Sequence, residues 1–246
     1  MNYPNYSPPW ALQNGFAMTL YTAFFAKNEA EKLALPEPPY QSHIFSGASE
    51  VPLFGLVAIP EHPKGTIIAT YGITGNLDNQ WFLKILGRKA YAQGYAIVLF
   101  DWRAHGKTAE LSPVLTSDGL YEGEDFVRIA AQAKSLGCPA PFWFSGYSLG
   151  GQLALWAVHA AQTIQDWGSD LDLSDADLAG GVVICPSLDS IRSLQYLMSH
   201  PIGRQFEQAI ARQLKILAQE LHRYHPNDID LNAVDRANSI WGFDHE

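Results

Sequence analysis

Short apolar runs alternate with amphipathic stretches through the middle of the chain. Runs of β-branched and aromatic residues predict buried strands at 66–70, 95–100, 141–145 and 181–185. Apolar positions at helical spacing, which at the first helix are Phe82, Leu86 and Ala90, predict intervening helices at 80–91, 122–136 and 149–165. This rhythm is typical of an α/β fold with a mostly parallel, doubly wound sheet, whose ligands bind beyond the carboxyl ends of the strands.

Both ends of the chain depart from this rhythm. Residues 1–40 are rich in proline and aromatic residues and predict an extended arm with one short helix around 15–34. The alternating pattern of the next segments predicts a β-hairpin of 41–46 with 53–59. After residue 187 no further strand is expected, and the periodicity predicts helices at 191–199, 204–224 and 232–241.

Composition and charge narrow the function classes. The chain is 47% hydrophobic and 17% charged, which is typical of a packed domain rather than a disordered one. Its net charge of −9 disfavours nucleic-acid partners. Cys138 and Cys185 have no metal-ligand or disulfide spacing, so two buried thiols in a reducing compartment are expected, with no metal and no cofactor.

The first basic residue is Lys27, so the N-terminus lacks the positive segment of a secretory signal. The apolar stretch 16–26 is shorter than the roughly 20 residues that span a bilayer. It is expected either to pack on the body as a helix or to touch lipid as an amphipathic surface. We therefore expect a cytoplasmic protein, with peripheral membrane contact as an alternative.

The segment 142–151 reads F-W-F-S-G-Y-S-L-G-G and contains the motif that most directly predicts a catalytic function. It joins a predicted strand to a predicted helix through G-x-S-x-G, the pattern of a nucleophile elbow. Ser148 would sit on a strained turn, flanked at close approach by Gly146 and Gly150, and the backbone N–H of Leu149 would bind an oxyanion. The alternative is a glycine-rich turn with an inert serine.

A second oxyanion donor is expected from the turn after the 66–70 strand. That turn reads Y-G-I-T-G over 71–75, and its candidate donor is the backbone N–H of Ile73. Each such donor is worth roughly 10²–10³ in rate. The alternative is an ordinary strand–helix loop.

The order of these motifs resembles the α/β-hydrolase fold and, within it, the YheT-like family of esterases and acyltransferases. Residues 71–75 resemble the family's H-G-L-T-G turn, with Tyr71 in place of histidine. Residues 100–106 resemble its F-N-x-R-G-x-G loop, 146–151 match its elbow, and 186–189 resemble the start of its lid. The resemblance implies one hydrolase domain over 1–246, with an arm (1–40), a core sheet (41–186) and a helical lid (187–241).

A serine nucleophile needs a base and an acid that orients the base. The family's catalytic Asp and His follow two further strands, and the chain has no matching positions, so we expect it to end before them. An exposed sheet edge and low solubility or oligomerisation would follow. Asp189 is either an acid or a helix N-cap. The histidines are expected to have other roles: His105 structural, His159 about 16 Å from Ser148, and His200, His222 and His225 facing solvent in the lid, with His245 at the terminus.

These features predict a serine hydrolase that acts on carboxylic esters through an acyl-enzyme on Ser148. Its substrate is expected to be a small-molecule acyl ester, which the family resemblance makes medium-chain or lipid-like. Hydrolysis and acyl transfer share the acyl-enzyme, so both stay open. The alternative is a non-catalytic, hydrolase-like binding protein that keeps the pocket and has lost the triad.

Overall fold

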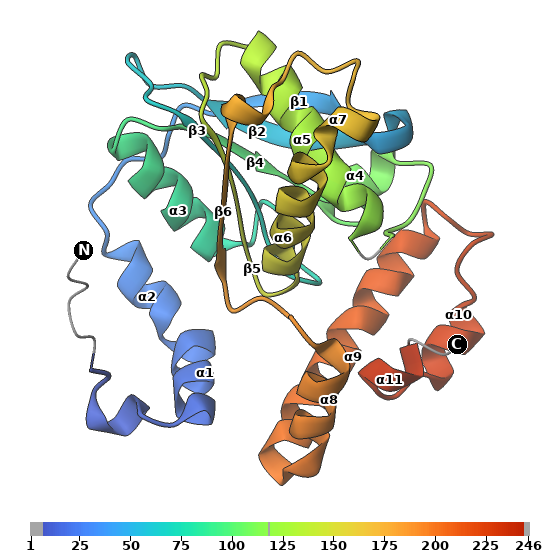
Figure 1. Ribbon diagram of the computed structural model, residues 1–246. Coiled ribbons are helices and arrows are strands. Elements are labelled where there is room, and N and C mark those ends of the chain that lie inside the picture. Colours follow the sequence, from blue (N-terminus) through green and yellow to red (C-terminus); the bar gives the residue numbers. More distant parts are fainter. Residues whose placement is uncertain (1–6, 118, 244–246) are drawn as a thin grey trace.

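A computed structural model describes residues 7–117 and 119–243, and its core is a six-stranded sheet with the order β1-β2-β4-β3-β5-β6 (Figure 1). The strands are β1 (Gln41–Ser46), β2 (Pro52–Ala58), β3 (Thr66–Thr70), β4 (Ala96–Phe100), β5 (Phe142–Tyr147) and β6 (Leu178–Ile184). β1 and β2 form the predicted hairpin and β2 runs antiparallel to β4, whereas β4, β3, β5 and β6 are parallel. The predicted α/β class and mostly parallel sheet are confirmed.

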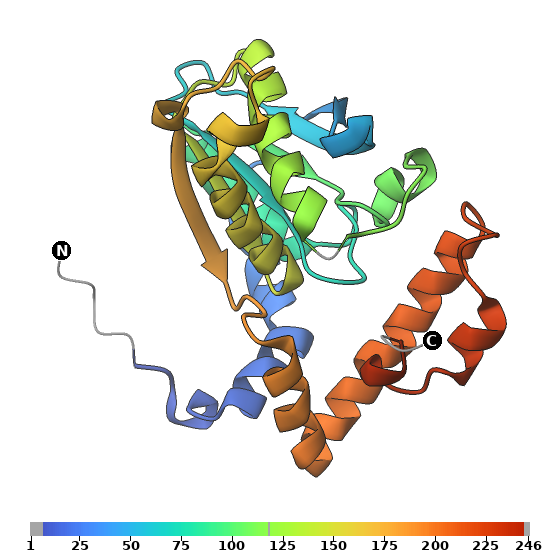
Figure 2. The same ribbon diagram turned by 45° about the vertical axis from the view of Figure 1, so that its right-hand side comes forward.

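Helices cover both faces of this sheet (Figures 1 and 2). On one face α5 (Leu120–Ser135) and α6 (Leu149–Gln162) pack against each other, and α3 (Trp81–Ala92) lies on the other. The Phe126 ring of α5 contacts Phe100 of β4 and Phe144 of β5 with ring centroids 4.8 and 5.6 Å apart. These fully buried rings tie the helix layer to the central strands.

Two helical segments, one before β1 and one after β6, lie beyond the sheet (Figure 2), and the names arm and lid are kept for them. The arm holds η1 (Trp10–Leu12), α1 (Gly15–Phe24) and α2 (Ala26–Glu31), and the lid holds α8 (Ser190–Ser199), α9 (Pro201–His222), α10 (Leu231–Arg236) and α11 (Ile240–Phe243). The arm contacts the lid through Phe16, whose ring stacks on Tyr196 of α8 and Phe206 of α9. Within the described residues, no helix combines the length and apolar character needed to cross a membrane.

Several predicted helices are divided or shifted. The single arm helix is two helices, and the predicted 149–165 helix breaks at Thr163 before α7 (Ile164–Trp167). The 232–241 helix is interrupted at Ala237, whose backbone is extended. In α3 the buried positions are Leu83, Gly87 and Ala90, and Leu86 packs partly buried against the core, so the predicted stripe is confirmed at Leu86 and Ala90 and is wrong at Phe82, which is exposed.

Four further elements were not predicted, because each is short. They are η1 (Trp10–Leu12), η2 (Ala48–Glu50), η3 (Asp175–Asp177) and α4 (Gly106–Leu111), which follows β4 after the loop 101–105. β6 also starts three residues earlier than predicted, at Leu178, because Gly180 and Gly181 obscure its apolar pattern. Short or glycine-rich segments carry too little periodicity to be found from the sequence.

The last strand of the sheet has one open side. Among the described residues no strand pairs with the outer edge of β6, and Val182 and Ile184 are 61% and 51% exposed. Cys185 follows the strand and is also exposed, so the prediction of a buried thiol is wrong there, whereas it is confirmed for Cys138. The edge keeps Cys185 open to solvent because no neighbouring described element covers it.

Candidate active site

Ser148 occupies a sharp turn between β5 and α6. Its backbone angles, φ 54° and ψ −129°, lie outside the regions that a non-glycine residue usually adopts. A Cβ at Gly146 would lie 2.2 Å from the carbonyl oxygen of Gly150, and one at Gly150 would lie 2.3 Å from the carbonyl oxygen of Tyr71. Both positions therefore admit only glycine, and the turn holds the serine at the carboxyl end of β5.

The turn over 71–75 packs directly against the serine. A Cβ at Gly72 would lie 2.9 Å from Ser148 Cβ and 3.3 Å from Ser148 Oγ. The hydrogen bonds found among residues 7–117 and 119–243 leave the amides of Ile73 and Leu149 without a partner. Two free N–H donors thus flank the serine at the start of α6, where the helix macrodipole also favours negative charge.

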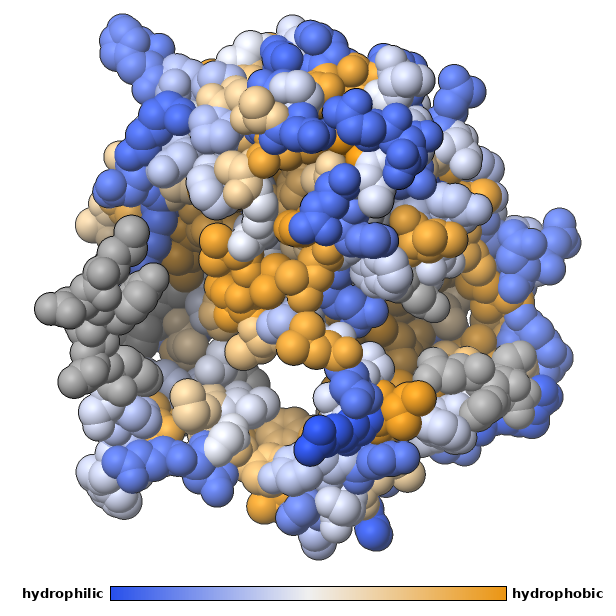
Figure 3. All heavy atoms as spheres, viewed as in Figure 1, coloured by the Kyte–Doolittle hydropathy of each residue, from blue (hydrophilic) through white to orange (hydrophobic). Residues whose placement is uncertain are grey.

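Ser148, Leu149 and Ile73 line one cavity of about 250 Å³. The opposite wall comes from the lid and is largely apolar, with Leu194 of α8 and Leu214 of α9 among its side chains. Figure 3 shows hydrophobic side chains along the upper border of an opening between the body and the lower helices. Ser148 and the two residues whose amides are unpartnered therefore border one largely apolar chamber.

Among the described residues that line this cavity there is no histidine, aspartate or glutamate. Asp189 is the N-cap of α8, where its carboxylate accepts the Arg192 N–H at 2.9 Å, as the N-cap alternative expected. His105 is buried beneath the 71–75 turn, and His159 lies beside Trp156 at the end of α6. Neither lines the cavity.

The lid histidines make contacts of their own. His200 packs against Phe16, and His222 Nδ1 lies 2.9 Å from the Ile229 carbonyl oxygen. His225 is buried, so the expectation that it faces solvent is wrong; its backbone N–H donates to the Leu221 carbonyl in the last turn of α9, and its Nδ1 lies 3.7 Å from Asp228 Oδ2. His245 lies outside the described residues.

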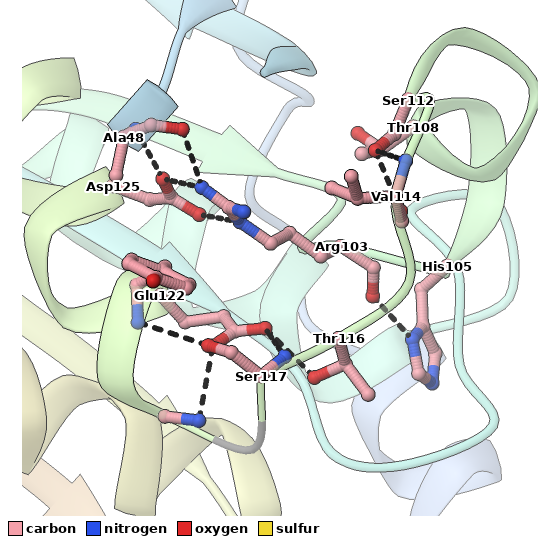
Figure 4. Close-up of polar contacts among 12 residues, drawn as sticks. Ala48, Arg103, His105, Thr108, Ser112, Val114, Thr116, Ser117, Glu122 and Asp125 are labelled. Carbon is pink, nitrogen blue, oxygen red and sulfur yellow. Dashed lines mark hydrogen bonds and ion pairs between the residues drawn. The ribbon is translucent and has the colours of Figure 1, made fainter. Parts of the chain in front are cut away.

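A buried polar network beneath the site was not found from the sequence (Figure 4). Arg103 donates to Asp125 from Nε at 2.7 Å and from Nη2 at 2.8 Å, and Nη2 also donates to the Ala48 carbonyl at 2.8 Å. Asp101 accepts hydrogen bonds from the Tyr71 hydroxyl at 2.5 Å and from the Leu77 amide at 3.0 Å. A charged residue among the apolar positions of α5 is the sequence signal that points to such a network.

Burial affects the pKa of each carboxyl group beneath the site. It raises the pKa of Asp101 and of Asp125, although hydrogen bonds lower the first and the Arg103 ion pair lowers the second. Burial would also raise the pKa of Glu122, but hydrogen bonds led by those from Ser117 hold it below its usual value. Glu122 caps the start of α5, and the described residues contain no cluster of three His, Cys, Asp or Glu that could hold a metal.

The fold and the site's geometry agree with comparisons to known proteins. Residues 75–241 match the alpha/beta hydrolase family, and the chain belongs to this family. A protein of Synechocystis sp. whose name reads "Putative esterase" is 59% identical over 249 residues, which cover 99% of this chain and 68% of that protein.

A solved structure shares the fold. The Pyrococcus furiosus esterase superposes with a TM-score of 0.51 at 17% identity, covering 81% of this chain and 66% of its own. The chain thus spans about two thirds of the length of either relative.

Proposed function

We propose that the protein hydrolyses carboxylic esters through an acyl-enzyme on Ser148. The observation that carries this proposal is the meeting of Ser148 with the unpartnered amides of Ile73 and Leu149 at one end of an apolar cavity. Membership of the α/β-hydrolase family and the name of the Synechocystis relative support an ester as the substrate.

In the proposed reaction, Ser148 Oγ attacks the ester carbonyl carbon and its proton passes to a base. The negative charge that develops on the carbonyl oxygen is held by the N–H groups of Leu149 and Ile73, each worth roughly 10²–10³ in rate. The C–O bond breaks, the alcohol leaves with the proton, and water or a second alcohol resolves the acyl-enzyme. No described histidine or carboxylate lines the cavity, so the base must reach Ser148 from elsewhere.

The walls of the cavity suit the acyl half of the ester. Leu194, Leu197 and Leu214 offer hydrocarbon contacts, and burying a CH₂ group gains about 0.8 kcal/mol. An acyl chain of medium length is therefore the proposed substrate, and hydrolysis should become faster as the chain lengthens from acetyl until the cavity is full.

A lipid-like substrate is consistent with a second feature, an exposed apolar surface away from the cavity. The helix α1 and the α8–α9 corner lie at the same end of the molecule (Figure 2). They expose apolar side chains, such as Phe24 of α1 and Ile202 of α9. We include peripheral lipid contact in the proposal. Phosphatidylcholine vesicles should sediment the protein, and a Phe24→Ser, Ile202→Ser double variant should stay in solution; failure of the unmodified protein to sediment refutes this part.

A serine-directed fluorophosphonate tests the reaction. The unmodified chain and a Ser42→Ala control, altered at an exposed serine of β1, should become labelled and should hydrolyse p-nitrophenyl esters. Ser148→Ala should lose both properties. Labelling of Ser148→Ala at the rate of the unmodified chain would contradict the proposal.

The absence of a base among the described cavity residues favours a second candidate, a binding protein that holds an acyl ligand without turnover. The same experiment separates the two. A binding protein would not be labelled by the fluorophosphonate but would retain a fatty acid in equilibrium dialysis. Leu194→Asp should then abolish that retention.

A further inference from the structure

His105 lies directly beneath the turn that carries the Ile73 amide. Its Nε2 accepts the backbone N–H of Thr74 at 3.1 Å, and its Nδ1 lies 3.0 Å from the Arg103 carbonyl oxygen. A carbonyl oxygen only accepts and a backbone N–H only donates, so one neutral tautomer, with the proton on Nδ1, satisfies both contacts.

The surroundings hold the imidazole in this state. His105 is 2% exposed and its ring stacks on Trp102 with centroids 3.6 Å apart. Burial lowers its pKa to about 4, against smaller opposing effects from the Arg103 carbonyl and the Glu122 carboxylate. The ring is therefore uncharged at neutral pH and keeps the lone pair that Thr74 requires.

Arg103, whose carbonyl oxygen is the partner of His105 Nδ1, is itself held by hydrogen bonds (Figure 4). The Arg103 guanidinium is held by both oxygens of Asp125 and by the Ala48 carbonyl, and both charged side chains are buried. The backbone of Arg103, which offers the acceptor for Nδ1–H, therefore has little freedom. Contacts thus run continuously from α5 through the loop after β4 to the 71–75 turn.

The turn itself needs this support. Thr74 has φ 62°, a left-handed conformation that a β-branched residue adopts only under constraint. Asp101 holds the turn on both sides of Thr74, through the Tyr71 hydroxyl and the Leu77 amide. His105 supplies the contact at the strained residue, one peptide unit after the Ile73 amide.

From these contacts we infer that His105 is a positioning residue, which holds the strained Thr74 and thereby aims the Ile73 N–H at the developing oxyanion. This inference rests on the proposed function, because the direction of the Ile73 amide matters only if an oxyanion forms. Interactions realised only in the transition state raise kcat and leave KM nearly unchanged. His105 should therefore act on kcat, although it touches no substrate.

The kinetic test compares two replacements of His105. His105→Phe fills the space but cannot accept, and should lower kcat about 10–100-fold with KM within about threefold. His105→Gln places a carbonyl oxygen near the position of Nε2 and should recover most of kcat. His43→Phe, in which a ring replaces a partly buried imidazole of β1, should match the unmodified protein. Unchanged kcat in folded His105→Phe, or a loss confined to KM, overturns the inference.

A spectroscopic test covers the case in which His105→Phe does not fold. The imidazole ¹⁵N shifts of the unmodified protein should show a neutral ring protonated at Nδ1 at pH 7, and the opposite tautomer or a cation overturns the inference. An unmodified chain that binds acyl ligands but turns over no ester overturns both this inference and the proposed function. Turnover that survives His105→Phe overturns the inference alone.

Discussion

The buried ion pair between Arg103 and Asp125 allows a sharp test of how the site is supported. Arg103→Met keeps a long, unbranched side chain but removes all the donors. It leaves the Asp125 carboxylate fully buried, with the Ala48 amide at 2.7 Å as its remaining partner. The variant therefore isolates the cost of an uncompensated buried charge.

The size of the effect follows from burial. Removing one member of a buried pair costs about 3–5 kcal/mol. In a protein of this length each kcal/mol lowers Tm by about 2–4 °C, so Tm should fall by roughly 6–20 °C. The Arg88–Glu37 pair has a similar separation, 3.1 Å, but its side chains are 25% and 51% exposed. Arg88→Met should cost less than about 1 kcal/mol.

The pH dependence gives the loss a specific signature. Burial raises the pKa of Asp125 and Arg103 opposes that rise, so Arg103→Met raises the pKa further. A carboxyl group whose pKa is raised by folding favours the folded state most at a pH below its pKa in the unfolded chain. That contribution to stability is lost as pH rises through its pKa in the folded protein. The Tm difference from the unmodified protein should therefore narrow between pH 8 and pH 5.

Differential scanning calorimetry across that pH range checks both statements. The reasoning is refuted if Arg103→Met lowers Tm by less than about 2 °C at pH 7, or if the difference does not change with pH. A loss of equal size in Arg88→Met would also refute it, since burial would then not be the cause.

Three further outcomes are expected. Gly72→Ala pushes a Cβ to 2.9 Å from Ser148 Cβ, and fluorophosphonate labelling should slow by at least 10-fold while Tm changes little, unlike a general folding defect. The pKa of Glu122 is lowered in the folded protein, so its carboxylate stabilises the fold above the pKa of the unfolded chain. That stabilisation is lost as pH falls through the pKa of the folded protein, and Glu122→Gln should flatten this acid limb of the Tm–pH curve. Leu194→Trp fills the cavity, and should reduce kcat/KM for an octanoyl ester far more than for an acetyl ester in the same assay.

Features that depend on neighbours along the chain could be predicted from the sequence. The strand, the turn at Ser148 and the helix after it are contiguous, and the glycines two residues before and after the serine are needed by that local geometry alone. The expectation that 71–75 and Ser148 share one edge followed from the parallel sheet, and the structure places them side by side because β3 and β5 are adjacent parallel strands.

Other features depended on packing between distant segments. The exposure of Phe82 on α3 and the burial of His225 are set by which faces meet, and local periodicity does not report that. Arg103 is buried although it is charged, because Asp125, on α5, and the Ala48 carbonyl accept its hydrogen bonds.

The sequence by itself predicted the strands, the elbow motif and the two candidate N–H donors, since each prediction rests on spacing within short segments. Only the tertiary structure decided that His105 supports the Thr74 amide and that the lid closes an apolar cavity over Ser148. The physical reason is that hydrogen bonds and burial between remote residues depend on their positions in space, which a local pattern of apolar and polar residues does not specify.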